Sequence, residues 1–283
     1  MNEIIKERVV VLFDGADCSD GFGGAWAAWK KFKNKARYIG VLHQNPIPDG
    51  IKNKIVYMID FTYPEEDIKK MMKENISVTS IDHHASAKKA IMLTNNYSYS
   101  ENNSGSVLAW KYFFAKKPVP KILKYIEDMD LWKNKLPYSE EIFLYHNLYQ
   151  FNFNVWNKLE RILEDPKKFK QCIKIGAALL KYQENLIGLL INKNIEEVIF
   201  EGHKARAINS PFFSSQIGNK LLNKEFAVGI IWKRGCNNID VSLRGDGRVD
   251  VSKLAQKYNG GGHKNAAGFK IRNFPLPWKK IIG

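Results

Sequence analysis

The chain carries an Asp-His-His tripeptide, Asp82-His83-His84, directly after the largely apolar run at residues 76–81. Carboxylate and imidazole groups are a common ligand pair for Mn, Fe, Co or Zn. A strand that ends in these three side chains therefore indicates a metal or phosphate site. The tripeptide alone is weak support, because many such sequences form solvated turns, so the rest of the chain has to be considered with it.

Two other short apolar runs, at residues 9–13 and 55–59, also end in carboxylates. Both runs are rich in β-branched residues, which is typical of strands buried on both faces. The carboxylates that follow them are Asp14, Asp17, Asp20 and Asp60. Helical patterns at residues 22–33 and 64–74 alternate with the strands, and this order predicts a parallel α/β sheet.

The carboxyl ends of parallel strands meet at one edge of a sheet, and ligands bind at that edge. We therefore expect a group of seven side chains to converge there. They are Asp14, Asp17, Asp20, Asp60, Asp82, His83 and His84. Carboxylates gathered in one crevice repel each other unless cations hold them. The simplest interpretation is a two-metal centre.

Three consecutive glycines near the C-terminus precede a histidine, in Gly260-Gly261-Gly262-His263. Glycine lets the backbone approach a ligand closely and point N–H groups at an anion. A turn that only ends the helix expected at residues 251–258 needs a single glycine as its cap. The sequence therefore predicts a phosphate-binding loop.

These motifs together resemble the DHH phosphoesterase superfamily with its associated C-terminal domain, over nearly the whole chain. The resemblance assigns Asp17 and Asp20 to the first motif, Asp60 to the second, Asp82-His83-His84 to the third, Asp128 to the fourth and residues 260–268 to the glycine-rich signature. It implies a parallel-sheet domain, a connecting helix and a smaller mixed-sheet domain. It also implies an active site in the cleft between the domains.

The first motif departs from the family pattern. Many members begin it with His, where this chain has Asp14, and the usual Asp-x-Asp pair is displaced. Asp17 and Asp20 are one residue too far apart, and Cys18 takes the first place of Cys18-Ser19-Asp20. We rank Asp20 first as a ligand, then Asp17, then Asp14, with Cys18 last as a small buried residue at a tight turn.

The expected fold class is α/β, with three parts. Residues 1–165 form the DHH catalytic metal-binding domain, 166–194 the connecting helix and 195–283 the C-terminal substrate-binding domain, a smaller mixed α/β unit. Within the first domain we also expect a short strand at residues 90–93 and a helix that delivers Asp128 and Asp130. The resemblance favours Asp128 as the ligand, with Asp130 as a supporting or solvated residue. Trp132 is expected to pack in the core.

The composition of the chain indicates the cellular compartment in which this chemistry takes place. The 283 residues include no apolar stretch of transmembrane length, and residues 1–8 lack the apolar segment of a signal peptide. Three widely spaced cysteines, Cys18, Cys172 and Cys236, suggest a reducing compartment. We expect a cytoplasmic protein with no membrane partner.

The formal net charge of +15 favours polyanionic partners, with nucleic acid first. A lysine-rich coding background produces the same charge, so the charge agrees with a phosphodiester substrate without proving it.

We expect a metal-dependent phosphodiesterase, an exonuclease that hydrolyses short single-stranded RNA or DNA or another phosphodiester. Its expected cofactors are two divalent ions, Mn²⁺ first, with Mg²⁺ or Co²⁺ as alternatives. In the implied site Asp60 bridges the ions, and the other ligands are Asp14 or Asp17, Asp20, His83 and Asp128. Alternatives are a pyrophosphatase or exopolyphosphatase, a cyclic-dinucleotide phosphodiesterase, or a catalytically impaired nucleic-acid-binding relative. A homodimer is one oligomeric state open to the chain.

The remaining site residues have auxiliary roles in this scheme. His84 donates to a phosphoryl oxygen or the leaving group, and Asp82 orients its neighbours by hydrogen bonding. Arg244, which ends a predicted strand, suits bidentate phosphate contact. With His263 and the amides of Gly260, Gly261 and Gly262, it is expected to hold a distal phosphate.

Overall fold

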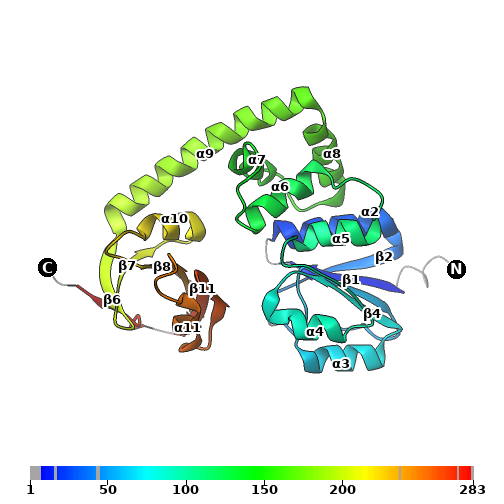
Figure 1. Cartoon of the computed structure of the whole chain (residues 1–283), viewed down its shortest axis with the longest axis horizontal. Coiled ribbons are helices and arrows are strands. Elements are labelled where there is room, and N and C mark those ends of the chain that lie inside the picture. Colours follow the sequence, from blue (N-terminus) through cyan, green and yellow to red (C-terminus); the bar gives the residue numbers. More distant parts are fainter. Residues whose placement is uncertain (1–7, 16–17, 43–44, 236, 273, 282–283) are drawn as a thin grey trace. The chain divides into compact units, whose positions relative to one another are not determined.

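The computed structural model describes residues 8–15, 18–42, 45–235, 237–272 and 274–281. The chain divides into two compact units, Met1–Leu180 and Lys181–Gly283. The long helix α9 (Pro166–Asn194), which the sequence predicts as the connector, contains the boundary between them (Figure 1). Among the described helices, none combines the length and apolar composition that a membrane crossing requires.

The first unit is built on a sheet of five strands, all parallel, in the order β2-β1-β3-β4-β5. The strands are β1 (Val9–Asp14), β2 (Ala36–Val41), β3 (Ile55–Ile59), β4 (Ser77–Asp82) and β5 (Asn96–Tyr99). The prediction of a parallel α/β sheet is confirmed. Because every strand runs in the same direction, the residues that end β1, β3 and β4 lie at one edge.

Helices cover both faces of this sheet (Figure 1). Helices α2 (Ser19–Phe32) and α5 (Gly105–Phe113) lie on one face, and α3 (Glu65–Glu74) and α4 (Lys88–Leu93) lie on the other. Helices α6 (Lys121–Asp130), α7 (Ser139–His146) and α8 (Phe153–Glu164) add a further layer on the side of α2. Residues 90–93 therefore lie in α4, and the prediction of a strand there is wrong. A run of four apolar residues does not by itself distinguish a strand from a helix turn.

Helix α2 lies unusually close to its neighbours because its first half is rich in glycine. A Cβ on Gly23 would lie 2.9 Å from Ser106 Cβ, and one on Gly24 would overlap the side chain of Ile59. The buried residues Trp26, Ala27 and Ala28 continue the same face of the helix into the main core. This close packing holds the N-terminus of α2 against the strand ends and against the start of α5.

The second unit is a smaller mixed α/β domain, as predicted. Its seven-stranded sheet has the order β10-β11-β9-β8-β7-β6-β12, with β7 and β8 parallel and the other pairs antiparallel. The strands are β6 (Glu196–Phe200), β7 (His203–Asn209), β8 (Val228–Arg234), β9 (Ile239–Gly245), β10 (Gly261–His263), β11 (Ala266–Ile271) and β12 (Lys279–Lys280). Helices α10 (Ser214–Leu221) and α11 (Val251–Gln256) pack on it.

Candidate metal centre

The strand ends of the first unit bring four acidic or imidazole side chains to one cavity. Asp14 is the last residue of β1, Asp60 follows β3, and Asp82 ends β4 just before the two histidines. Asp14, Asp60, Asp82 and His84 all line a cavity of about 160 Å³. The convergence that the parallel order predicts is thus present for these residues.

Asp60 occupies the centre of the cluster. It is 3% exposed, and its backbone adopts the left-handed conformation, with φ of 64°. Aspartate tolerates this conformation better than most residues, and such backbone is frequent at functional sites. Burial, followed by the charge of Asp20, raises the pKa of Asp60 well above its ordinary value, so an unaided carboxylate is disfavoured here.

Asp20 enters the cluster from the first turn of α2 and is 2% exposed. Its Oδ1 accepts the backbone N–H of Ser106, at the start of α5, at 3.1 Å. Within the described residues, its Oδ2 is buried and accepts no hydrogen bond. The buried Oδ1 of Asp60 also accepts none, although Nε2 of His83 lies 3.2 Å from it. A buried carboxylate oxygen without a donor is costly, and a bound cation would remove that cost.

His83 joins Asp60 to a further carboxylate. Its Nε2 lies 3.2 Å from Asp60 Oδ1 and 3.6 Å from Asp130 Oδ2. Ligands of one ion at 2.0–2.2 Å stand roughly 2.8–3.6 Å apart, so these spacings suit a shared metal. Burial and the charge of Asp20 raise the pKa of Asp130 to about 8, which a nearby divalent cation would counteract.

Asp82 and His84 form a hydrogen-bonded pair beside this cluster. Asp82 is fully buried, and its Oδ1 lies 2.7 Å from Nδ1 of His84, while Thr62 Oγ1 donates to its Oδ2 at 2.7 Å. Burial opposes the charged form of Asp82, but these hydrogen bonds and the charge of His84 keep its pKa below the ordinary value. The bond to Asp82 in turn raises the pKa of His84. With Nδ1 held by Asp82, Nε2 of His84 remains for a ligand or substrate.

Among the described residues, three overlapping groups offer ligand atoms that lie within 4.8 Å of one another. They are Asp60, His83 and His84; Asp14, Cys18 and Asp60; and Asp20, His83 and Asp130. Asp60 and His83 each belong to two groups. The carboxylate of Asp60 can bridge two ions, whereas Nε2 of His83 can bind only one. The orphaned buried oxygens and the oxygen-and-nitrogen donor set both fit divalent metal ions.

Of the two carboxylates that α6 delivers, Asp130 lies in this cluster, whereas Asp128, which the resemblance assigns to the fourth motif, does not. Both oxygens of Asp128 are engaged, by the backbone N–H groups of Lys135 and Leu136 and by Ser139 Oγ at 3.0, 3.1 and 2.6 Å. Asp128 thus fixes the loop after α6. Residues two positions apart on a helix point in different directions, and the sequence contained no signal that decided between them.

Two further residues differ from their predicted surroundings. Trp132, expected in the core, is 53% exposed directly after α6, with φ of 51°. Cys18, ranked last among the first-motif ligands, places Sγ 3.3 Å from Asp60 Oδ2. Burial raises the pKa of the Cys18 thiol to about 12. Asp17, the other first-motif candidate, lies outside the described residues.

In the second unit, the structure brings Arg244 and His263 to the same face of the sheet. His263 pairs with Ala266, which pairs in turn with Arg244, so the three residues form one row across β10, β11 and β9. Residues directly opposite each other share a face, and two strand spacings separate Arg244 from His263 by about 10 Å. Arg244 Nη2 donates to Ser215 Oγ at 2.7 Å, which fixes the guanidinium.

The glycine loop is only partly available for an anion. The N–H of Gly260 donates to Ala255 O at 3.0 Å and thereby ends α11, so it does not serve as the predicted phosphate donor. Gly261, Gly262 and His263 form the exposed edge strand β10. Their exposure leaves His263 and the backbone of this edge accessible to a ligand.

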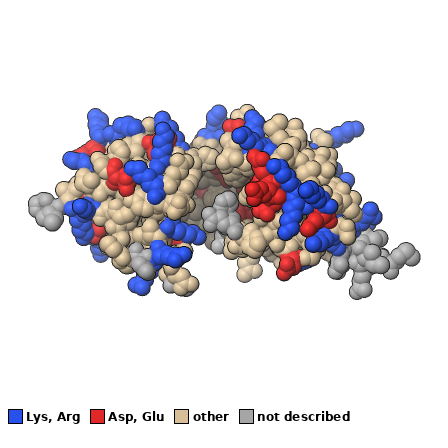
Figure 2. Space-filling model, turned by 90° about the horizontal axis from the view of Figure 1, so that it is seen from below, with Lys and Arg blue, Asp and Glu red and all other residues tan. Residues whose placement is uncertain are grey.

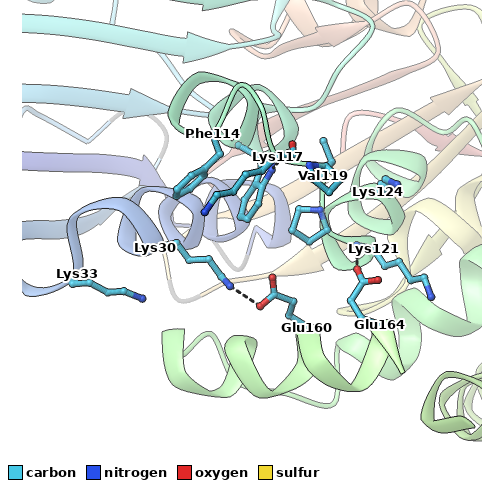
Figure 3. A pocket seen from close by; sticks show the side chains of 12 residues that line it. Lys30, Lys33, Phe114, Lys117, Val119, Lys121, Lys124, Glu160 and Glu164 are labelled. Atoms are coloured by element: carbon cyan, nitrogen blue, oxygen red, sulfur yellow. Dashed lines mark hydrogen bonds and ion pairs between the residues drawn. The ribbon is translucent and has the colours of Figure 1, made fainter. Parts of the chain in front are cut away.

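A second cavity of the first unit, about 540 Å³, is basic and lies apart from the metal centre. It is found at the C-terminal end of α2, where Lys30 and Lys33 line it together with Lys117, Lys121 and Lys124 (Figure 3). Lys30 is paired there with Glu160 at 2.5 Å. None of the candidate ligands that the structure describes lines this cavity.

Comparisons with known proteins agree with this architecture. The profile of the DHHA1 domain matches residues 198–281. Over 305 aligned residues the chain is 32% identical to the uncharacterized protein R106 of Acanthamoeba polyphaga mimivirus, covering 98% of this chain and 71% of that protein.

Two solved structures share the fold at low sequence identity. The DHH domain of a protein assigned to a family of ribosomal proteins aligns with a TM-score of 0.56 and 11% identity, over 94% of this chain and 83% of that chain. RecJ from Thermus thermophilus, solved with Mn²⁺, aligns with a TM-score of 0.51 and 14% identity, over 94% of this chain and 50% of that chain. The chain is therefore a relative of protein R106, its second unit contains the DHHA1 domain, and its fold is shared by DHH-domain proteins.

Proposed function

We propose that the protein is a metal-dependent phosphodiesterase whose catalytic centre holds two divalent ions in the first unit. The observation that carries this proposal is that the carboxylate of Asp60 belongs to two groups of ligand atoms, beside a buried oxygen of Asp20 that has no donor among the described residues. Bound ions supply an activated water and stabilise the charge on the phosphoryl oxygens. Mn²⁺ is the first candidate, with Mg²⁺ or Co²⁺ as alternatives, and RecJ from Thermus thermophilus was solved with Mn²⁺.

The residues around the ions have distinct roles. Asp14, Asp20, Asp60, His83 and Asp130 are the proposed ligands. In a separate role, the side chain of His84 presents Nε2 for proton donation to a phosphoryl oxygen or to the leaving group. Asp82 holds the other ring nitrogen, which sets the tautomer and the ring orientation.

We propose a short single-stranded oligonucleotide as the substrate, and Trp132 is the residue that favours it over pyrophosphate. Its indole is 53% exposed and stands two residues after Asp130, so their Cα atoms are at most about 7 Å apart. An exposed indole whose backbone lies this close to Asp130 suits stacking on a base of a bound oligonucleotide, which is worth about 1–3 kcal/mol. Pyrophosphate has no base that could stack on the indole.

The second unit supplies a further phosphate contact in this proposal. Arg244 and His263 share one face of its sheet, and a guanidinium held by Ser215 is well oriented for phosphate. On the face drawn in Figure 2, Lys and Arg side chains are spread over the surface and do not form one patch. The proposed phosphate contact therefore rests on Arg244 and His263 and not on the net charge.

The test is a comparison of substrates with the purified full-length chain in the presence of Mn²⁺. We expect hydrolysis of labelled dinucleotides and short oligomers to exceed hydrolysis of pyrophosphate and cyclic dinucleotides. Trp132→Ala should lower kcat/KM for dinucleotides about 5- to 100-fold, following the stacking energy. It should leave bis-nitrophenyl phosphate hydrolysis nearly unchanged. Preferential pyrophosphate hydrolysis that Trp132→Ala does not alter would contradict the oligonucleotide assignment.

A further inference from the structure

Within the described part of the chain, the sulfur of Cys18 has two hydrogen-bond contacts, and both lie at the candidate metal centre. Its Sγ lies 3.3 Å from Asp60 Oδ2, and it accepts the backbone N–H of Gly21 at 3.4 Å as the N-cap of α2. With Asp14 and Asp60, Cys18 forms one of the groups whose ligand atoms lie within 4.8 Å of one another. The other carboxylate oxygen of Asp60, Oδ1, is buried, accepts no hydrogen bond from the described residues and lies 3.2 Å from Nε2 of His83.

We infer that Cys18 is a thiolate ligand of one ion, on the side of the centre that Asp14 and Asp60 form. This inference rests on the proposed two-ion centre and restricts which metal ions one of its two sites prefers. A sulfur ligand at 2.3 Å and an oxygen ligand at 2.0–2.2 Å on one ion stand roughly 3.1–3.6 Å apart. The separation of 3.3 Å between Sγ and Asp60 Oδ2 falls within that interval.

Helix capping does not explain the choice of cysteine. Ser, Thr, Asp and Asn are the preferred N-cap residues, because their oxygens accept strong hydrogen bonds from backbone N–H groups. Sulfur accepts such bonds weakly. A cysteine at this position therefore provides a poor cap, but it provides a good ligand for a borderline metal ion.

Thiolate ligation changes which ions the centre prefers. When an ion binds, the S–H bond of Cys18 breaks, the proton passes to solvent, and a sulfur–metal bond forms. Thiolate donors favour Zn²⁺, Fe²⁺, Co²⁺ and Cd²⁺ over Mg²⁺, which prefers oxygen. The side of the centre with Cys18 therefore selects the softer ions, while the side with Asp20 and Asp130 offers two carboxylates and one imidazole.

The test uses Co²⁺, because a Co²⁺–thiolate bond gives a near-ultraviolet charge-transfer absorption that oxygen and nitrogen ligands do not give. The full-length protein is titrated with Co²⁺ as wild type, Cys18→Ser, Cys18→Asp and, as a matched control, Cys172→Ser. Cys172 is a buried cysteine of the same unit outside the ligand groups. We expect the band in the wild type and in the control, and its loss in both Cys18 variants.

Cys18→Asp separates ligation from folding, since a carboxylate can also bind an ion. This variant should retain the bound Co²⁺ count of the wild type and lose only the charge-transfer band. Its affinity for Cd²⁺, measured by calorimetry, should fall at least about tenfold relative to its affinity for Mn²⁺. Loss of a residue that only hydrogen-bonds to a metal ligand already lowers metal affinity about 10- to 100-fold, so loss of the ligand itself should cost at least as much.

The outcomes distinguish this inference from the proposed function. Two results would overturn thiolate ligation by Cys18: Co²⁺ that binds the wild type without a thiolate band, or a band that survives in Cys18→Asp. Neither result would contradict the proposed metal centre. Failure of the wild type to bind Co²⁺ or Mn²⁺ would overturn both.

Discussion

The replacement of Gly105 by alanine tests whether the start of α5 fixes the position of Asp60. Gly105 is the first residue of this helix, and a Cβ there would lie 2.6 Å from Asp60 Cβ and 2.7 Å from its Oδ1. Ordinary van der Waals contact begins at 3.4 Å, so the closest contact falls short by about 0.8 Å. Either Asp60 or the helix must move by that amount.

A displacement of this size should disable the centre without unfolding the protein. A 1 Å misplacement of a catalytic group can cost about 100-fold in rate, so kcat/KM for a dinucleotide should fall by roughly that factor. Mn²⁺ affinity, measured by calorimetry, should fall with it. Thermal unfolding should stay cooperative, because alanine is favoured over glycine within helices by about 0.5–1 kcal/mol, which offsets part of the strain.

Gly188→Ala in α9 is the matched control, because a Cβ at that position meets no atom within 4 Å. The same substitution there should leave activity and Mn²⁺ affinity unchanged and raise the free energy of unfolding slightly. If Gly105→Ala also leaves both quantities unchanged, Asp60 does not depend on α5 for its position, and the geometric argument for the centre fails.

Three further predictions concern separate parts of the chain. Asp130→Asn should weaken Mn²⁺ binding, measured by calorimetry, without loss of stability. Asp128→Ala should instead lower the free energy of unfolding, measured by chemical denaturation, by about 2 kcal/mol or more and leave Mn²⁺ binding intact. Weaker Mn²⁺ binding in Asp128→Ala with unchanged binding in Asp130→Asn would contradict this assignment. Arg244→Gln should raise KM for dinucleotides about tenfold or more and affect bis-nitrophenyl phosphate little, and equal losses on both substrates would show a structural role. Burial lowers the pKa of His146 from 6.5 to about 4, so the unfolded chain takes up a proton first and stability is lost as the pH falls from 6.5 towards 4. His146→Gln should remove about 3 kcal/mol of this dependence in denaturation curves across that range, and equal slopes in both proteins would contradict it.

The sequence contained enough information for the architecture of the first unit. Short β-branched runs that alternate with helical patterns predict a parallel sheet, and parallel strands place their ends at one edge. This reasoning brought Asp14, Asp60 and Asp82 together, and all three line one cavity. It failed at residues 90–93, where four apolar residues form part of α4 and the strand follows at Asn96–Tyr99.

The sequence did not determine which of the neighbouring side chains point into the site. The orientation of Asp128 and Asp130 depends on where α6 meets its neighbours, which no spacing in the sequence reveals. Gly105 gave no signal as a site residue, because its role is to leave room for another side chain. The sequence ranks Cys18 last, as a small buried residue at a tight turn, whereas the packing of α2 against Asp60 brings its sulfur to the ligand groups.

The central claim is that two ions share Asp60, and the number of ions bound per chain tests it most directly. Equilibrium dialysis against Mn²⁺ followed by elemental analysis should find two ions per wild-type chain. Asp60 contributes to two of the three ligand groups, so Asp60→Asn should lose both ions over the same concentration range while the protein stays folded. A single ion in the wild type, or two ions retained in Asp60→Asn, would contradict the account.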